Sequence, residues 1–266
     1  MTQSDQELTV LLSEPAPHVR LVTLNLPRLR NAMTEEMTTA WADVVSGLEK
    51  DRDVRALVVT GSGTSFCSGA DLSWLDEAPA DDRTPDRLRG KMAPFYRAWL
   101  APRELPFPVI AAVNGPAIGA GVCLALACDL RYASNDAVFK TPFNYLGTHG
   151  GMGITALLPE VIGDARAREM LFTGRNVMAD EARDWGLVTG VNDDVLSYSI
   201  DVACTIASAA PIPTKLTKTG LEQGRAGLAA AVAWESLAQP ITMATSDLHE
   251  GIAANKARRH PLFTGH

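Results

Sequence analysis

Two apolar runs that each end in a glycine-containing turn constrain the fold of this chain more than any other feature. Arg55–Thr60 (RALVVT) is followed by the turn Phe66–Leu72 (FCSGADL), and Pro108–Val113 (PVIAAV) is followed by Asn114–Gly121 (NGPAIGAG). Runs of β-branched residues between charged or glycine-rich flanks predict buried strands. Each turn leads into a segment that predicts a helix, so the sequence indicates strand–turn–helix units of the α/β class.

The remaining periodicity extends this α/β pattern and then becomes helical. A helix with an apolar stripe is predicted from Met37 to Leu48 with Thr34 as its N-cap, and residues 78–89 predict a mobile polar excursion. The other predicted strands are Leu8–Leu12, Val19–Leu26, Leu130–Ala133, Ala137–Lys140 and Leu187–Val191, and the other helices are Met92–Leu100, Val195–Ala210, Thr214–Gln223, Leu228–Thr245 and Asp247–Arg259. The chain is therefore expected to divide into a core at residues 1–195 and a C-terminal helical region at residues 196–266.

Charge and cysteine usage argue against several broad classes of protein. The chain has 24 basic and 31 acidic residues, a formal charge of −7, which disfavours nucleic-acid binding because phosphate is repelled. The four cysteines form no CxxC pair and no zinc-ligand spacing, so we expect no disulfide, no metal and a cytoplasmic location. Residues 107–128 carry no charge, but Pro108, Gly115 and Pro116 divide them into a strand, a turn and a helix, so no membrane span is predicted.

Both turns have the composition of a site that presents backbone N–H groups. Glycine and alanine let a ligand approach the main chain closely, and the first residues of a helix have N–H groups without intrahelical partners. Two such donors aimed at one carbonyl oxygen form an oxyanion hole, which stabilises negative charge as it develops. Alternatively, the glycines only permit close packing of helix on strand. The occurrence of two such turns, each after a buried strand, favours the oxyanion hole.

Two other enzyme classes are matched only in part. The run Gly61–Phe66 (GSGTSF) begins like a dinucleotide-binding fingerprint, but Phe66 stands where the third glycine is required. The run Gly151–Ala156 (GMGITA) fits a variant of that fingerprint, but no buried strand precedes it. The GxSxG motif of serine hydrolases is absent. These mismatches argue against an oxidoreductase and against a serine hydrolase.

The chain resembles the enoyl-CoA hydratase/isomerase (crotonase) family in three segments, FCSGADL, AAVNGPAIGAGVCLALACDLRYAS and LLPEVIGDARAREMLFTGRNVMADEARDWGLV. The resemblance implies a crotonase (ClpP-like) spiral of repeated ββα units with a C-terminal helical region, assembled as a homo-trimer or hexamer. It also implies an acyl-CoA or enoyl-CoA thioester as ligand, with coenzyme A as part of the substrate and no separate cofactor. The thioester carbonyl would lie between the N–H groups of Ala70 and Ala120.

The resemblance also assigns contacts to coenzyme A. Arg30 corresponds to the segment beside the phosphates and the pantetheine. Ser68, Asp71 and Leu72 correspond to the adenine-side turn, and Lys256 and Phe263 correspond to positions that reach coenzyme A from a neighbouring helix or subunit. A solvated helix lysine is an equally good interpretation of Lys256.

The chain departs from the family at the catalytic carboxylates. The two glutamates of the family's hydratases would fall at Cys123 and Phe143, and the aspartate of its dehalogenases and dienoyl isomerases would fall at Gly151. Acid–base catalysis of hydration needs carboxylates at these points, so we expect weak or no ordinary hydratase activity. Cys123 could act as a nucleophile or be a small buried hydrophobe, and His149 could act as an acid or base or be an ordinary loop histidine.

Two functional hypotheses follow from this departure. One is a divergent enzyme of the enoyl-CoA hydratase/isomerase class that stabilises a thioester enolate. The other is a catalytically silent acyl-CoA binding or regulatory protein. In either case Leu228–Thr245 is apolar around most of a helical circumference, which predicts that this segment takes part in oligomerisation.

Overall fold

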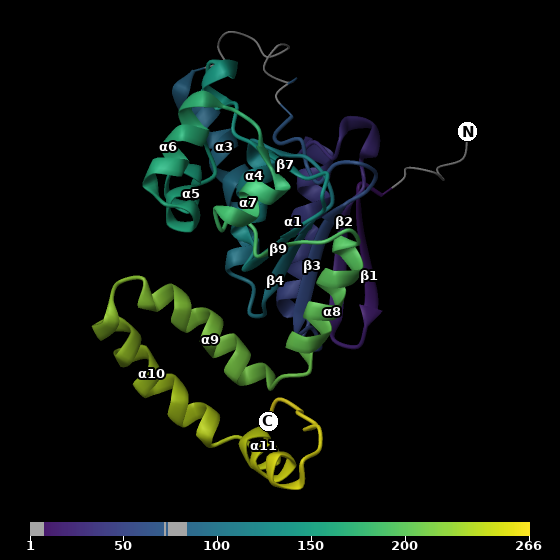
Figure 1. Cartoon of the computed structure of the whole chain (residues 1–266), viewed down its shortest axis with the longest axis vertical. Coiled ribbons are helices and arrows are strands. Elements are labelled where there is room, and N and C mark those ends of the chain that lie inside the picture. Colours follow the sequence, from purple (N-terminus) through teal and green to yellow (C-terminus); the bar gives the residue numbers. More distant parts are fainter. Residues whose placement is uncertain (1–7, 72, 74–83) are drawn as a thin grey trace, which may run out of the picture.

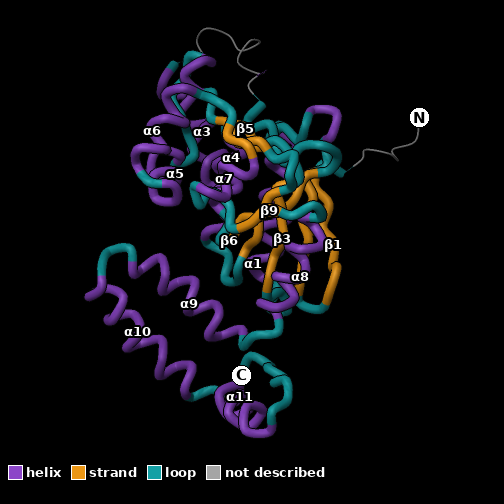
Figure 2. The backbone as a smooth tube through the Cα atoms, viewed as in Figure 1, coloured by secondary structure: helices purple, strands orange, loops and turns teal. Residues whose placement is uncertain are grey.

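The structure of the chain, a computed structural model, describes residues 8–71, 73 and 84–266. At its centre is a six-stranded sheet with the strand order β1-β2-β3-β4-β6-β9 (Figures 1 and 2). The edge strand β1 pairs antiparallel with β2, and the other neighbouring strands pair in parallel. The strands are β1 (Val10–Ala16), β2 (Val19–Leu24), β3 (Ala56–Gly61), β4 (Val109–Val113), β6 (Leu130–Ala133) and β9 (Gly190–Val191).

A second, smaller sheet lies beside the first at the ends of its strands. It consists of three short strands in the order β5-β7-β8. These are β5 (Ala117–Ile118), β7 (Val138–Lys140) and β8 (Val177–Met178). Because β5 falls inside the second glycine-containing turn, the small sheet fixes where that turn lies relative to the main sheet.

Helices cover both faces of the main sheet. On β3 and β4, one alternate set of side chains (Leu57, Val59, Val109, Ala111) belongs to the larger core with α1 (Glu35–Lys50), α3 (Pro85–Leu100) and α4 (Ala120–Ala127). The other set (Ala56, Val58, Ile110, Ala112) packs under α8 (Val195–Ala207). Burial on both faces explains why these two strands have continuous apolar sequences. The helices α5 (Ile154–Ile162), α6 (Asp164–Thr173) and α7 (Ala179–Asp184) lie beyond α4 (Figure 1).

Most of the predicted elements are confirmed within a few residues. Thr34 caps α1 as expected, because its hydroxyl accepts a hydrogen bond from the Met37 N–H at 3.1 Å. The charge-free segment 107–128 does form a strand, a turn and a buried helix. Among the described residues no single helix has the length and apolar character to cross a bilayer, although the bent pair α8 and α9 (Pro211–Gly224) passes on those two criteria together.

Two predictions about the elements were wrong. The polar excursion predicted at 78–89 ends earlier, because Pro85 occupies the first turn of α3 and the helix runs unbroken from there to Leu100. Residues 78–83 lie outside the described residues. The strand predicted at Leu187–Val191 is reduced to the two residues of β9, because only Gly190 and Val191 pair with β6.

The C-terminal helices extend away from the sheet. Figure 1 shows α9 (Pro211–Gly224) and α10 (Leu228–Met243) as a hairpin that leads to α11 (Ser246–Ala257) at the opposite end of the molecule from α5 and α6. The boundary predicted at 195/196 falls just after the first residue of α8, which packs on the sheet, so the extended part begins with α9. Lys218 ties α9 to the core by donating to the carbonyl oxygens of Pro102 and Phe107 and by pairing with Asp129 at 2.8 Å.

Two tryptophans fasten α3 to α1. The rings of Trp41 and Trp99 stack with their centroids 4.8 Å apart, and both side chains are fully buried. Each indole N–H also bonds to the opposite helix, Trp41 to the Ala98 carbonyl at 2.9 Å and Trp99 to the Thr38 hydroxyl at 3.1 Å. This contact sets the position of the side chains that α3 presents to the glycine-containing turns.

Replacing Trp99 with alanine should destabilise the protein by roughly 3–5 kcal/mol, because a large buried ring is lost and leaves a cavity. The control Trp99→Phe keeps an aromatic ring in contact with Trp41 but loses the hydrogen bond to Thr38 and part of the buried ring volume, so it should cost less, about 1–3 kcal/mol. Urea denaturation measures both values. Equal losses for the two variants would contradict the role given to the stacked rings.

Candidate active site

The two glycine-containing turns are joined directly by backbone hydrogen bonds. The carbonyl of Pro116 accepts from the N–H groups of Phe66 and Cys67 at 3.1 and 3.2 Å, and the Ile118 N–H donates to the Cys67 carbonyl at 2.9 Å. Gly121 lies so close to this carbonyl that a side-chain carbon at position 121 would overlap it. The two turns, about fifty residues apart in sequence, therefore form one continuous piece of main chain.

The first turn is also fixed on its other side. The Met33 N–H donates to the Gly69 carbonyl at 2.8 Å, and the Asp71 N–H donates to the Met33 carbonyl at 3.3 Å. This pattern is a parallel bridge between Met33 and Ala70. In such a bridge the middle residue directs its own N–H away from the partner strand. Among the described residues the Ala70 N–H has no backbone acceptor.

The second turn presents its donor at the start of a helix. Ala120 is the first residue of α4, so its N–H has no carbonyl one turn earlier to bond with. Gly119 precedes it with φ of 54°, and Gly69 in the first turn has φ of 96°, a region that favours glycine. A side-chain carbon at Gly69 would lie 3.2 Å from the Ala120 nitrogen. The small residues thus allow the two donors to approach each other.

Ala70 and Ala120 line the same cavity, which has a volume of about 130 Å³. Its other walls come from α3, from the 3-10 helix Phe143–Leu146 and from the loop that follows it. The lining side chains are mostly apolar and include Met92, Phe95, Tyr96, Phe143, Leu146 and Met152. A second cavity of about 410 Å³ between α1 and α3 shares Ala70, Met92 and Phe95 with the first. Together they offer space for an acyl group next to two unpaired N–H donors.

The chain is similar to known proteins in both sequence and fold. The family model for enoyl-CoA hydratase/isomerase matches residues 15–266. A "probable enoyl-CoA hydratase" of Mycobacterium leprae is 38% identical over 94% of this chain and 88% of its own. The short-chain-enoyl-CoA hydratase of Clostridium acetobutylicum is 34% identical over 93% of this chain and 95% of its own. The crystal structure of an enoyl-CoA hydratase from Bacillus anthracis superposes with a TM-score of 0.92 at 31% identity, covering 97% of this chain and 100% of that one.

This chain belongs to the enoyl-CoA hydratase/isomerase family. The family resemblance and the crotonase fold predicted from the sequence are thereby confirmed. The α/β core with its C-terminal helical region is the expected arrangement.

The position at which the sequence predicts the first missing glutamate holds a buried thiol. Cys123 lies on α4 and is fully buried, with its sulfur 3.5 Å from the Gly119 carbonyl and 3.6 Å from the Gly151 carbonyl. Burial raises the pKa of the Cys123 thiol to about 12. At neutral pH the group is protonated, and a protonated thiol is not a nucleophile. The geometry therefore favours the interpretation of Cys123 as a small buried hydrophobe.

The position at which the sequence predicts the second missing glutamate faces the cavity directly. Phe143 lines it, and its ring lies within contact distance of a side-chain carbon built on Gly119 or on Gly150. His149 lines the same cavity from an exposed loop. Of the two residues proposed from the sequence as acid, base or nucleophile, only His149 opens onto the cavity.

The residues expected to contact coenzyme A lie in two separate places. Ser68 lines the cavity, and its backbone N–H donates to the carbonyl of the exposed Arg30 at 3.0 Å. Asp71 lines the adjoining cavity, and Leu72 lies outside the described residues. Lys256 lies on α11 and Phe263 follows it, at the opposite end of the molecule from α5 and α6, and neither lines either cavity (Figure 1).

Sequence reasoning missed two asparagines that hold the turns, Asn31, which is buried, and Asn114, which is half-buried. Asn31 accepts from the Leu26 N–H and donates to the carbonyls of Ser62 and Ser65. Asn114 accepts from the Gly61 N–H at 3.1 Å and donates to the Gly63 carbonyl at 3.0 Å. The sequence offers little signal for either role, because an asparagine in a loop usually caps its own turn rather than a distant one.

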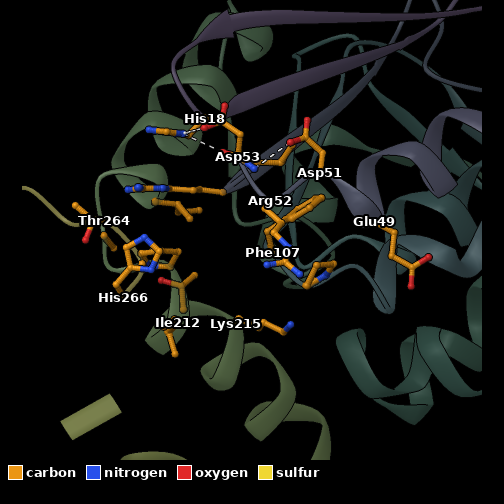
Figure 3. A pocket seen from close by; sticks show the side chains of 18 of the residues that line it. His18, Glu49, Asp51, Arg52, Asp53, Phe107, Ile212, Lys215, Thr264 and His266 are labelled. Atoms are coloured by element: carbon orange, nitrogen blue, oxygen red, sulfur yellow. Dashed lines mark hydrogen bonds and ion pairs between the residues drawn. The ribbon is translucent and has the colours of Figure 1, made fainter. Parts of the chain in front are cut away.

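A larger cavity lies elsewhere in the described part of the molecule. It has a volume of about 880 Å³ and lies between the core and the start of α9 (Figure 3). Acidic and basic side chains line it together, including Asp51, Arg52 and Lys215, and His18 pairs with Asp53 there at 2.9 Å. No residue of either glycine-containing turn reaches it. Within the described ranges no cluster of three or more potential metal ligands was found.

Alkylation of the folded protein with iodoacetamide at pH 8 should leave Cys123 unmodified. With a pKa of about 12, only about one Cys123 in 10⁴ is a thiolate at that pH, and the fraction grows as the pH rises. Cys204, which is partly exposed on α8, serves as the internal reference, and peptide mass spectrometry measures both. Urea should make the two cysteines equally reactive. If Cys123 is labelled as fast as Cys204 without urea, Cys123 is again a candidate nucleophile.

Proposed function

We propose that this protein binds an acyl-CoA or enoyl-CoA thioester with the carbonyl oxygen between the N–H groups of Ala70 and Ala120. The observation that carries the proposal is that these two N–H groups, fixed by separate backbone contacts, line one small apolar cavity. Donors in a cavity that excludes water stabilise a developing thioester enolate strongly, because they need no reorganisation during the reaction. The chain acts as an enzyme of the enoyl-CoA hydratase/isomerase class.

Coenzyme A enters this site as part of the substrate, and no separate cofactor is required. Ser68, Asp71 and Arg30 lie at or beside the two cavities, in positions to receive the part of the ligand next to the thioester. Lys256 and Phe263 line neither cavity, so their proposed role is to reach coenzyme A bound to a neighbouring subunit. The expected location of the protein is the cytoplasm.

Replacing Ala120 with proline tests the oxyanion hole. Proline is accepted at the first position of a helix, but it has no N–H to donate. We expect Ala120→Pro to bind butyryl-CoA at least about tenfold more weakly, since one hydrogen bond to the carbonyl is lost. Ala120→Gly keeps the N–H and should bind within about twofold of wild type.

Isothermal titration calorimetry measures this affinity, and a thermal melt shows whether each variant folds. Wild-type binding stabilises the folded state in proportion to ligand concentration, which provides an independent readout. Unchanged affinity in a folded Ala120→Pro protein would contradict the proposal, as would a wild-type protein that binds no coenzyme A ester.

The enzyme should hydrate enoyl-CoA slowly. Neither Cys123 nor Phe143 can carry a proton to or from water at neutral pH, and a positioned acid or base contributes roughly 10²–10⁴-fold to such reactions. The loss of crotonyl-CoA absorbance should therefore proceed more slowly than in a hydratase with both glutamates by about that factor. Turnover at the ordinary rate would show that the missing carboxylates do not limit this enzyme.

A catalytically silent acyl-CoA binding protein is the second candidate function. The observation that favours it is that no described residue lining the oxyanion-hole cavity carries a carboxylate. Binding of both saturated and unsaturated esters without any chemical change would support this alternative.

The assembly expected for this chain is a homo-trimer or hexamer. The face of α10 exposes large apolar side chains in the single chain, among them Leu228, Val232, Leu237, Ile241 and Met243. An isolated helix hairpin with so much exposed apolar surface needs a partner to cover it. Light scattering at micromolar concentration should give three or six times the mass of the chain. A Leu237→Glu variant should shift the population toward the monomer, whereas a monomeric wild type would contradict this assembly.

A further inference from the structure

A tyrosine on α3 enters the cavity at the place where the family's carboxylates are missing. Tyr96 lines the cavity together with Ala70 and Ala120. Its hydroxyl lies against the main chain of Gly151, so closely that a side-chain carbon at position 151 would overlap the hydroxyl oxygen. The Cys123 sulfur is 3.6 Å from the carbonyl of the same glycine. Tyr96 therefore lies next to two of the three positions at which a carboxylate is absent.

The hydroxyl of Tyr96 is free to interact with a ligand. Among the described residues it has no hydrogen-bond partner, although the side chain is partly buried. The hydroxyl oxygen is not fully buried, so it can bond to water until a ligand displaces that water. Its aromatic ring packs against Phe95 and, beyond it, Trp99, so its position follows from the contact between α3 and α1.

We propose that Tyr96 is the group that protonates the α-carbon of the thioester enolate held by Ala70 and Ala120. This inference rests on the proposed function, because it needs an acyl-CoA ester in the oxyanion hole. The tyrosine proton goes to the α-carbon, the enolate electron pair forms the new C–H bond, and the carbonyl is restored. The tyrosinate that remains takes a proton from water, which returns the enzyme to its starting state.

The surroundings of Tyr96 keep it in the form that donates. Burial raises its pKa above the ordinary value, and the nearby Cys123 raises it further. Two titratable groups face Tyr96: Cys123 on α4, and His149 in the loop that lines another wall of the cavity. At neutral pH the tyrosine is a proton donor, and it is still acidic enough to protonate a thioester enolate, which is a far stronger base. Protonated Tyr96 is a poor base, so it does not activate water, which agrees with the slow hydration expected for this enzyme.

Exchange of the α-hydrogens of butyryl-CoA in D₂O tests this role without requiring hydration. By microscopic reversibility, the group that protonates the α-carbon removes the same proton in reverse. The probe is butyryl-CoA at saturating concentration and pH 8, with deuterium uptake followed by mass spectrometry and the enzyme-free rate subtracted. We expect wild type to exchange and Tyr96→Phe to lose at least about 10²-fold in rate, with a dissociation constant within about twofold of wild type.

Three further variants make the assignment specific. Tyr145→Phe alters an exposed tyrosine outside the cavity lining and should exchange at the wild-type rate. Gly151→Ala keeps the tyrosine but displaces its hydroxyl, so it should lower the rate, and it should add little to Tyr96→Phe in the double variant. His149→Ala tests the competing residue and should retain most of the exchange.

The outcomes separate this inference from the proposed function. If wild type binds no butyryl-CoA, the proposed function fails and the role of Tyr96 fails with it. If binding depends on the Ala120 N–H but exchange is unaffected by Tyr96→Phe, or is absent in wild type, only the role of Tyr96 is overturned. If His149→Ala loses exchange while Tyr96→Phe retains it, the proposed role of Tyr96 is also overturned and the role passes to His149.

Discussion

The site depends on the double attachment of one short stretch of main chain, residues 66–70. On one side it is bonded to Pro116 and Ile118, and on the other side it forms a parallel bridge with Met33. These contacts use the N–H groups of Phe66, Cys67 and the adjoining Asp71 and the carbonyl groups of Cys67 and Gly69. They leave the Ala70 N–H without a backbone acceptor among the described residues. A donor held in this way cannot turn to bond elsewhere, so it is already in position when a carbonyl oxygen arrives.

The packing of the sheet brings that stretch to its partners. β3 and β4 are neighbours in the parallel sheet, so the turns that follow their carboxyl ends emerge side by side. Both strands are buried on both faces, under α1 and α4 on one side and α8 on the other, which leaves them little freedom to shift. The stacked tryptophans then place α3 over the turns, and α3 supplies much of the apolar wall. The low polarity of this wall makes each N–H donor act more strongly on a nearby charge.

The cavity differs electrostatically from one that holds a pair of glutamates. Cys123 is protonated, Phe143 is apolar, and Gly151 leaves room that the Tyr96 hydroxyl occupies. In the proposed function this cavity, whose described lining carries no carboxylate, stabilises an enolate through the two N–H groups, while Asp71 lines the adjoining cavity. It also lacks a strong base at neutral pH, which separates the ability to bind and polarise a thioester from the ability to activate water. In this proposal, binding of the thioester and catalysis of its hydration are therefore separate properties of the enzyme.

The sequence by itself determined the α/β class and the two strand–turn–helix units, because these depend on local patterns: β-branched runs, glycines and a helix start. The resemblance to the family then predicted Ala70 and Ala120 as the donors, and Cys123 and Phe143 as the positions without the family's glutamates. Only the tertiary structure decided that the Cys123 thiol is buried, that Asn31 and Asn114 hold the turns, that Lys256 and Phe263 line neither cavity, and that Tyr96 lines the smaller one. These facts depend on contacts between segments distant in sequence, and burial or a hydrogen-bond partner across such a distance leaves no periodic signal in the chain.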